Sequence, residues 1–193
     1  FELLKAQNFR NAAIELEKAA AADSSEARSF YALGKAYTAL NDYPKAITAY
    51  EHTLALGQYQ DRIPKVLAQL YHKAGIEAYG ERKYADAIGQ LEKSLKHNPK
   101  NAAALFAVGL CHTSLRAPSA AQASFERTIK ADPRYFKAYK ALGDIYYQRR
   151  EYAPAQKQYE KSLEINPKFT DAYGGLGRVL IDSGDLEKAV SRM

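Results

Sequence analysis

The sequence predicts an all-α fold, a stack of antiparallel helix pairs, and two observations support this prediction. Glycine recurs in five short phrases of similar composition (ALGKAY, KAGIEAY, AVGLCH, ALGDIY and GLGRVL), and residues of matching size recur in step with it. The glycines are separated by intervals of 41, 34, 34 and 34 residues: Gly34, Gly75, Gly109, Gly143 and Gly177. A period of 34 residues is the length of a two-helix unit, so the longer interval indicates an insertion of seven residues.

Small and large side chains alternate around each glycine. An alanine follows the glycine by twelve residues and a bulky residue follows that alanine by four: Ala46 and Tyr50, Ala87 and Leu91, Ala121 and Phe125, Ala155 and Tyr159, and Ala189 and Met193. A large side chain precedes each glycine by four residues: Phe30, Tyr71, Leu105, Tyr139 and Tyr173. Small residues let two helices approach closely, while large residues one turn away fill the remaining space. Each glycine is therefore expected at a close contact between paired helices.

This register places the helices along the chain. First helices are expected near residues 27–40, 62–79, 102–115, 136–149 and 170–183, each followed by a second helix, with no strand. One array results, with repeats at 27–60, 68–101, 102–135 and 136–169 and partial repeats at 1–26 and 170–193. The opening segment matches a second helix through Phe9, Ala12, Leu16 and Ala19. Terminal repeats of a stack need a polar outer face, so the chain is expected to be part of a longer array.

The seven inserted residues, 61–67, are expected to lengthen a helix rather than a loop. Their apolar residues keep spacings of three and four, which is typical of one helix face. The prediction is a helix from about Arg62 to about Tyr79, with Asp61 as its N-cap. Its extra turns are expected to project beyond the rim of the stack and to offer Ile63 and Val66 as a local contact for a neighbouring segment or a partner.

Composition limits the classes of partner. The chain has 28 basic and 22 acidic residues, a net charge of +6, and the basic residues are scattered rather than gathered in a tract. This predicts a mild preference for acidic partners and argues against nucleic acid. No apolar run approaches the roughly 20 residues that cross a bilayer, so no direct membrane insertion is expected.

The sequence predicts no enzyme, metal site or cofactor. The four histidines are too far apart in the chain for a local metal site, and only Cys111 and His112 are neighbours. Consecutive helical residues point in different directions and do not converge on one ligand. Cys111 is expected to be a small buried residue, and His112 takes a position that tyrosine fills in other repeats. Neither a hydrolase motif nor a phosphate-binding loop occurs.

The pattern resembles the tetratricopeptide family, whose 34-residue unit has an early large aromatic residue, Leu-Gly, then Tyr, Ala, an aromatic, Ala and a closing Pro. The resemblance covers essentially the whole chain, although the early aromatic is never Trp here and Pro118 replaces the large residue of other repeats. It implies a right-handed α-α superhelix, or solenoid, whose first helices line a concave groove. It also implies a non-enzymatic scaffold or adaptor that binds a peptide or partner protein in that groove.

In this family, fixed positions of each first helix face the groove, and they can be carried over to this chain. They give partner-binding candidates with aromatic and basic side chains that packing does not require: Arg28, Tyr31, Lys35, Gln69, His72, Tyr79, Phe106, Leu110, Thr113, Lys137, Lys140, Asp144, Tyr147 and Arg178. Aromatic faces and basic head groups suit an extended peptide. A merely solvated inner face is the alternative.

Family subtypes narrow the expected partner. The chaperone-type clamp for acidic C-terminal peptides needs Lys and Asn in one repeat and Asn in the next, and here Lys140 matches while Asp144 and Gly175 do not. The asparagine ladder of sugar-transferring relatives is missing as well. An alternative to the adaptor is a regulatory or substrate-recruiting segment of a larger enzyme or of a secretion or assembly machine. RNA binding is disfavoured because no position carries a recurrent base-reading pair.

Overall fold

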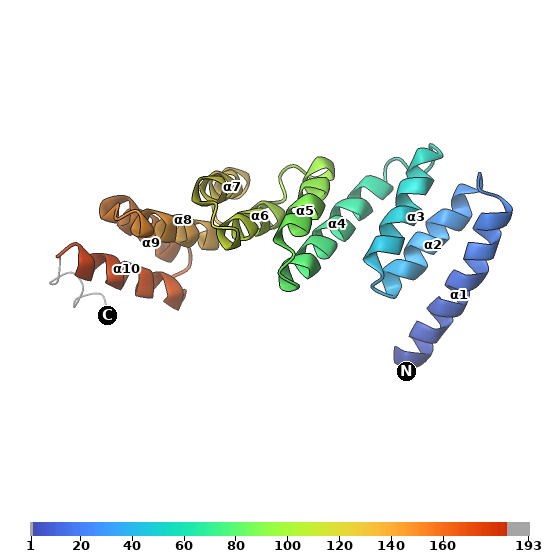
Figure 1. The fold of residues 1–193 in the computed structure, drawn as a ribbon, viewed down its shortest axis with the longest axis horizontal. Helices are drawn as coiled ribbons and strands as arrows, with labels where there is room; N and C mark the ends of the chain where they lie inside the picture. The colour runs from blue at the N-terminus through green and yellow to red at the C-terminus, as the bar shows by residue number, and fades with distance from the viewer. Residues whose placement is uncertain (1, 185–193) are drawn as a thin grey trace. The chain divides into compact units, whose positions relative to one another are not determined.

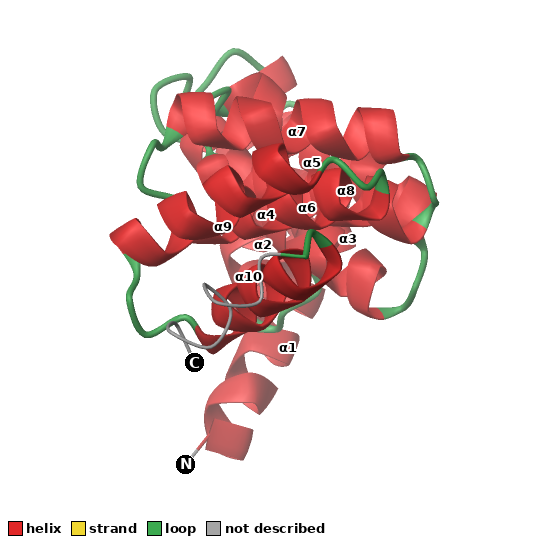
Figure 2. Ribbon diagram, turned by 90° about the vertical axis from the view of Figure 1, so that its left-hand side faces the viewer, coloured by secondary structure: helices red, strands yellow, loops and turns green. Residues whose placement is uncertain are grey.

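The computed structural model describes the backbone of residues 2–184 and the side chains of residues 7–184, and every regular element in this range is a helix (Figure 2). The helices are α1 (Glu2–Ala22), α2 (Ala27–Ala39), α3 (Tyr43–Ala55), α4 (Ile63–Gly80), α5 (Tyr84–His97), α6 (Ala102–Ser114), α7 (Pro118–Ala131), α8 (Phe136–Gln148), α9 (Tyr152–Ile165) and α10 (Thr170–Asp182). All five predicted first helices begin and end within one residue of their expected ranges. The all-α prediction is confirmed.

The helices belong to two compact units, Phe1–Pro99 with α1 to α5 and Lys100–Met193 with α6 to α10. In the first unit each helix packs against the next one along the chain, from blue α1 to green α5 in Figure 1. Successive helices pack in the same way in the second unit, where α8 also contacts α10. Two first helices therefore lie side by side there, which is the arrangement that a shared binding surface requires.

The predicted glycine contacts are confirmed in four repeats. Each glycine lies against the bulky residue sixteen positions later: Gly34 on Tyr50, Gly75 on Leu91, Gly109 on Phe125 and Gly143 on Tyr159. A Cβ atom on Gly143, for example, would stand 2.8 Å from the Tyr159 ring, whereas carbon atoms normally approach to about 3.5–4.0 Å. Gly177 is buried in α10, and its expected partners Ala189 and Met193 lie outside the described residues.

Helix α4 has 18 residues against 13 in α2, α6, α8 and α10, which confirms that the insertion lengthens a helix. Two details of that prediction are wrong. The N-cap is Arg62 rather than Asp61, and no side chain caps this end. Ile63 does not project beyond the stack: it is fully buried in the core of the first unit, and Val66 is half-buried against the same core.

The extra turns of α4 are buried because they pack against α3. Tyr71 of α4 donates a hydrogen bond to Glu51 of α3, as Tyr37 donates one to Glu17 of α1 34 residues earlier. Helix α4 thus keeps the 34-residue register toward α3 and uses the register shifted by seven residues toward α5, where Gly75 makes its contact. Since seven residues are close to two turns, one helix can present both registers on related faces.

Helix α1 follows the repeat frame on one side only. Ala13 and Ala20 are buried in the core of the first unit. Ala12 corresponds to the alanine that meets a first helix in complete repeats, but it is exposed, and Phe9 is 41% exposed. Among the described residues, α1 has no first helix of its own to cover this face.

Candidate functional site

A hollow of about 410 Å³ in the second unit lies among α6, α7 and α8. Three residues that the sequence assigned to a groove line it, namely Leu110 and Thr113 of α6 and Asp144 of α8. The remaining lining is mostly apolar: Ala117, Pro118, Ala121, Phe125, Ala141 and Ile145, with Arg116 and Gln148 as polar members. The repeat positions the hollow because α6 and α8 are successive first helices and α7 supplies the floor.

Asp144 links this hollow to the core of the second unit. Its two carboxylate oxygens accept hydrogen bonds of 2.7 Å, one from Lys140 Nζ and one from the Tyr159 hydroxyl. Burial, together with this bond to Asp144, raises the pKa of Tyr159. Sequence reasoning assigned Tyr159 to packing only. The signal that was missed is the polar end of a buried tyrosine, which needs a partner on a neighbouring helix.

A second hollow, of about 480 Å³, adjoins the first because Gln148 lines both. Tyr147, Arg150, Tyr152 and Asp182 complete its lining. The Tyr147 hydroxyl donates a 2.6 Å hydrogen bond to Asp182, and this bond raises the pKa of Tyr147. The Arg178 guanidinium lies 5.4 Å from the centre of the Tyr147 ring. The structure therefore brings Tyr147 of α8 and Arg178 of α10 together.

The remaining groove candidates of the second unit differ in exposure. Lys137 is exposed, with its ammonium group 6.0 Å from the ring of Phe136. Phe106 is half-buried, and its ring packs 5.4 Å from that of Phe125 and 5.1 Å from that of Tyr135. Phe106 therefore stabilises the wall between α6, α7 and the following connection.

In the first unit, the insertion covers one of the predicted groove residues. Tyr59, in the connection before α4, stacks on Tyr31 with ring centres 4.4 Å apart and planes 7° apart. Tyr59 has a φ of 57°, a left-handed conformation that is uncommon for an aromatic residue. Sequence reasoning missed Tyr59 because it treated the insertion only as helix.

The other candidates of the first unit are placed as follows. Arg28, Lys35 and Gln69 are exposed. Tyr79 packs against the Tyr84 ring at 5.5 Å. His72 is half-buried, burial lowers its pKa, and its buried Nε2 atom has no hydrogen-bond partner within the described part of the chain.

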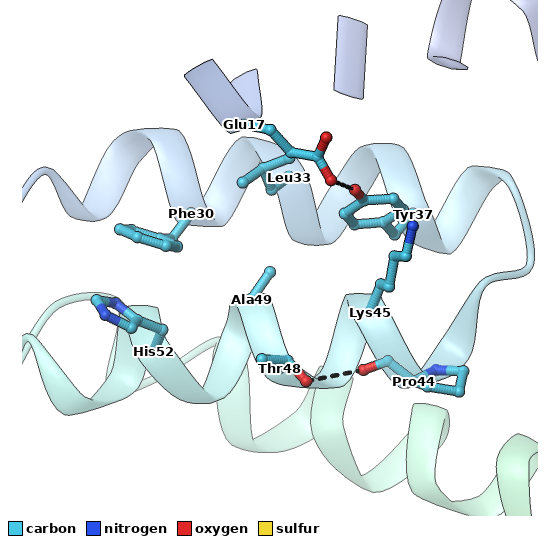
Figure 3. A pocket seen from close by; sticks show the side chains of 9 residues that line it. All are labelled: Glu17, Phe30, Leu33, Tyr37, Pro44, Lys45, Thr48, Ala49 and His52. Atoms are coloured by element: carbon cyan, nitrogen blue, oxygen red, sulfur yellow. Dashed lines mark hydrogen bonds between the residues drawn. The ribbon is translucent and has the colours of Figure 1, made fainter. Parts of the chain in front are cut away.

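A further hollow in the first unit contains none of the predicted groove residues. It has about 330 Å³ and lies between α2 and α3, with Glu17 of α1 at one side (Figure 3). Phe30 and His52 stack at one end, 3.8 Å apart. At the other end the Lys45 ammonium group lies 5.1 Å from the Tyr37 ring. Burial and the bond to Glu17 raise the pKa of Tyr37 to about 12.

The structure gives no support to catalytic or metal chemistry. Cys111 is fully buried, and burial raises the pKa of its thiol to about 11, so the reactive thiolate is disfavoured. Over residues that the structure describes, no three His, Cys, Asp or Glu side chains are grouped to hold a metal ion. No helix in the same range is long and apolar enough to span a membrane.

The geometry also explains why the chaperone-type clamp cannot form. Gly175, which takes the place of the second clamp asparagine, packs against the Tyr159 ring from α10, opposite the contact that Gly143 makes from α8. Any side chain at position 175 would collide with that buried ring. The first clamp position is Asp144, whose carboxylate is already bound by Lys140 and Tyr159.

Comparison with known proteins agrees with this architecture. A family model described as tetratricopeptide repeat matches residues 2–61 and 72–133, and two further models of that description match residues 136–169 and 158–191. A search of curated proteins gives no match.

Solved structures give similar folds. MamA protein is 25% identical with a TM-score of 0.65, over 86% of this chain and 87% of that one. The first TPR of Spaghetti (RPAP3), bound to the HSP90 peptide SRMEEVD, is 21% identical with a TM-score of 0.59, over 62% and 95%. YrrB, a TPR protein with an unusual peptide-binding site, is 22% identical with a TM-score of 0.58, over 88% and 84%. The family models cover more than half of this chain, which therefore belongs to the tetratricopeptide repeat family and is a protein-interaction repeat domain.

Proposed function

We propose that the second unit binds an extended peptide of a partner protein along α6, α8 and α10, without catalysis. The observation that carries this proposal is the 410 Å³ hollow, which is lined by carbon-rich side chains on two successive first helices. The hollow is large enough to receive one apolar side chain of the peptide. Burying such a side chain contributes about 1.5–3 kcal/mol.

Polar groups at the edge of the hollow suit a peptide backbone. Thr113 and Gln148 lie on opposite helices of the lining, and both are exposed. Gln148 and the aromatic ring of Tyr147 continue this surface toward α10. An extended peptide has unpaired N–H and C=O groups along its length, and such side chains can satisfy them.

Two of the structural neighbours favour a peptide as the ligand class. One was solved with a bound peptide, and another is described by its unusual peptide-binding site. The clamp positions of this chain are occupied by Asp144 and Gly175, so the SRMEEVD peptide is expected to bind no better than a scrambled sequence. The partner peptide is expected to use the hollow instead.

The hollow of Figure 3 is a second candidate location for the same function. Its lining combines the apolar side chains of Phe30, Leu33 and Ala49 with the basic side chains of Lys45 and His52. It belongs to the first unit, so the two locations can be blocked independently.

A pair of filling variants tests the proposal. Peptides that bind the whole chain are selected from a random display library, and their affinities are measured by fluorescence anisotropy. Ala141→Met, which fills the hollow of the second unit, is expected to weaken binding on the order of tenfold, equal to about 1.4 kcal/mol. Thr48→Trp, which fills the hollow of Figure 3, is expected to leave affinity unchanged.

The double variant Lys140→Ala, Tyr147→Ala probes the same surface without filling it and is expected to weaken binding by a similar factor. Melting curves verify that each variant is folded. If Thr48→Trp abolishes binding while Ala141→Met does not, the site is the hollow of Figure 3. If no variant of the second unit changes affinity, the proposed location is wrong.

A further inference from the structure

The turns that follow the first helices share an unusual backbone conformation. The second residue after each first helix has a positive φ: 58° at Asn41, 61° at Arg82, 56° at Arg116, 61° at Arg150 and 82° at Gly184. In the turn after α6 the Arg116 N–H donates to Thr113 O and the next N–H, of Ala117, donates to His112 O. The turn after α8 is bonded in the same way. This is the Schellman ending, which favours Gly and tolerates Asn at the left-handed position.

Arginine is a poor choice for this conformation. A side chain with a Cβ atom is strained there, and only Gly and, to a lesser extent, Asn or Asp adopt it routinely. Gly184 and Asn41 show that the same turn closes in this chain with the favoured residues. Three other repeats nevertheless carry arginine, so the side chain is retained at a conformational cost. Strain of this kind often marks a functional position.

Two of these arginines lie at the proposed peptide surface. Arg116 lines the 410 Å³ hollow and Arg150 lines the adjoining 480 Å³ hollow, with Gln148 shared between them. Both arginines are exposed, and within the described part of the chain no hydrogen bond or ion pair engages either guanidinium. They are therefore available to a partner at two points of one continuous surface.

The acidic side chains near these arginines leave their charge uncompensated. Asp144 is bound by Lys140 and Tyr159, and Asp182 accepts a hydrogen bond from Tyr147. Glu151, next to Arg150 in the chain, is exposed, and no salt bridge joins the two. Charge complementarity thus favours carboxylates that come from the partner. Arginine suits this role because its planar guanidinium can bind a carboxylate through two parallel hydrogen bonds.

We propose that the partner is an acidic peptide segment, with a large apolar residue that enters the hollow and Asp or Glu residues on either side that pair with Arg116 and Arg150. This proposal rests on the peptide function assigned to the second unit. It differs from the chaperone-type clamp, because the recognising residues lie in the turns after the first helices rather than on the helices themselves.

The test uses an array of twelve-residue peptides bearing one Leu, Phe or Met flanked by Asp or Glu, and a matched array in which Asn or Gln replaces every acid. The whole chain is expected to bind the acidic array on the order of tenfold more tightly. Arg116→Gly and Arg150→Gly are each expected to remove most of that preference. Their affinity for the neutral array is expected to be unchanged.

Arg82→Gly is the matched control, because Arg82 has the same left-handed conformation but lines neither hollow. All three glycine variants are expected to melt at a higher temperature than the wild type, while Arg82→Gly keeps the acidic preference. A higher melting temperature with lower affinity at positions 116 and 150 is the signature of a residue kept for binding.

Other outcomes overturn the proposal. Equal affinity for the two arrays, or an acidic preference that survives in Arg116→Gly and Arg150→Gly, shows that these arginines do not recognise carboxylates. Tighter binding of a twelve-residue oligothymidylate than of any peptide, lost in the same variants, assigns the arginines to nucleic acid. Failure of the peptide function is distinguishable, because then neither array binds or Ala141→Met weakens neither.

Discussion

Replacing Gly143 by alanine tests the contact that sets the spacing of α8 and α9. The new Cβ atom would stand 2.8–3.0 Å from three atoms of the Tyr159 ring, roughly 0.7–1.2 Å closer than carbon atoms normally approach. The ring cannot retreat easily, because it is fully buried and Gly175 of α10 packs against it as well. Its hydroxyl is also held by Asp144.

Two opposing terms determine the size of the effect. Alanine stabilises a helix interior by about 1 kcal/mol relative to glycine. Overpacking of a buried contact costs about 1–3 kcal/mol. Because Tyr159 is confined on two sides, we expect the upper half of that range and a net loss of about 1–2 kcal/mol in the free energy of unfolding.

Gly89→Ala provides the matched control. Gly89 lies in the interior of α5, it is exposed, and an added Cβ atom would meet nothing within 4 Å. This variant is expected to gain up to about 1 kcal/mol from helix propensity alone. Urea unfolding followed by circular dichroism measures both variants. If Gly143→Ala proves as stabilising as Gly89→Ala, the close contact at Tyr159 does not limit the packing of the pair.

Three further outcomes follow from the same structure. Ile63→Ala should lower the free energy of unfolding by about 2–5 kcal/mol, since Ile63 is fully buried; a change below about 0.5 kcal/mol in urea unfolding would place it at the surface instead. Cys111 should react with a thiol reagent only at the rate of unfolding, because burial shields it and raises its pKa to about 11; rapid labelling of the folded chain would contradict this. Tyr37 has a folded-state pKa of about 12, above the ordinary value near 10, so the stability it contributes is present below pH 10 and is lost as pH rises toward 12. Tyr37→Phe should therefore lose less stability between pH 9 and pH 11.5 than the wild type does, and an equal loss in both proteins would refute this assignment.

The sequence determined the helix pairs because their causes are local and repeated. Gly143 and Tyr159 recur in register with three other glycine pairs, so the periodicity alone located each helix and its close contact. The inserted segment also showed helical periodicity, which correctly predicted the long α4. Side-chain size and spacing suffice for such features, since they depend on neighbours one to four residues away on the same helix.

Only the tertiary structure decided what each candidate side chain touches. The same spacing that made α4 a helix could not show that Ile63 is buried by α3, because burial depends on the direction in which the neighbouring helix runs. Tyr59 covers Tyr31 through a left-handed turn that no sequence period announces. Asp144 looked like a free groove residue until its bond to Tyr159, on another helix, was visible. Contacts of this kind join residues that are distant in the chain, and they exist only once two helices have packed together.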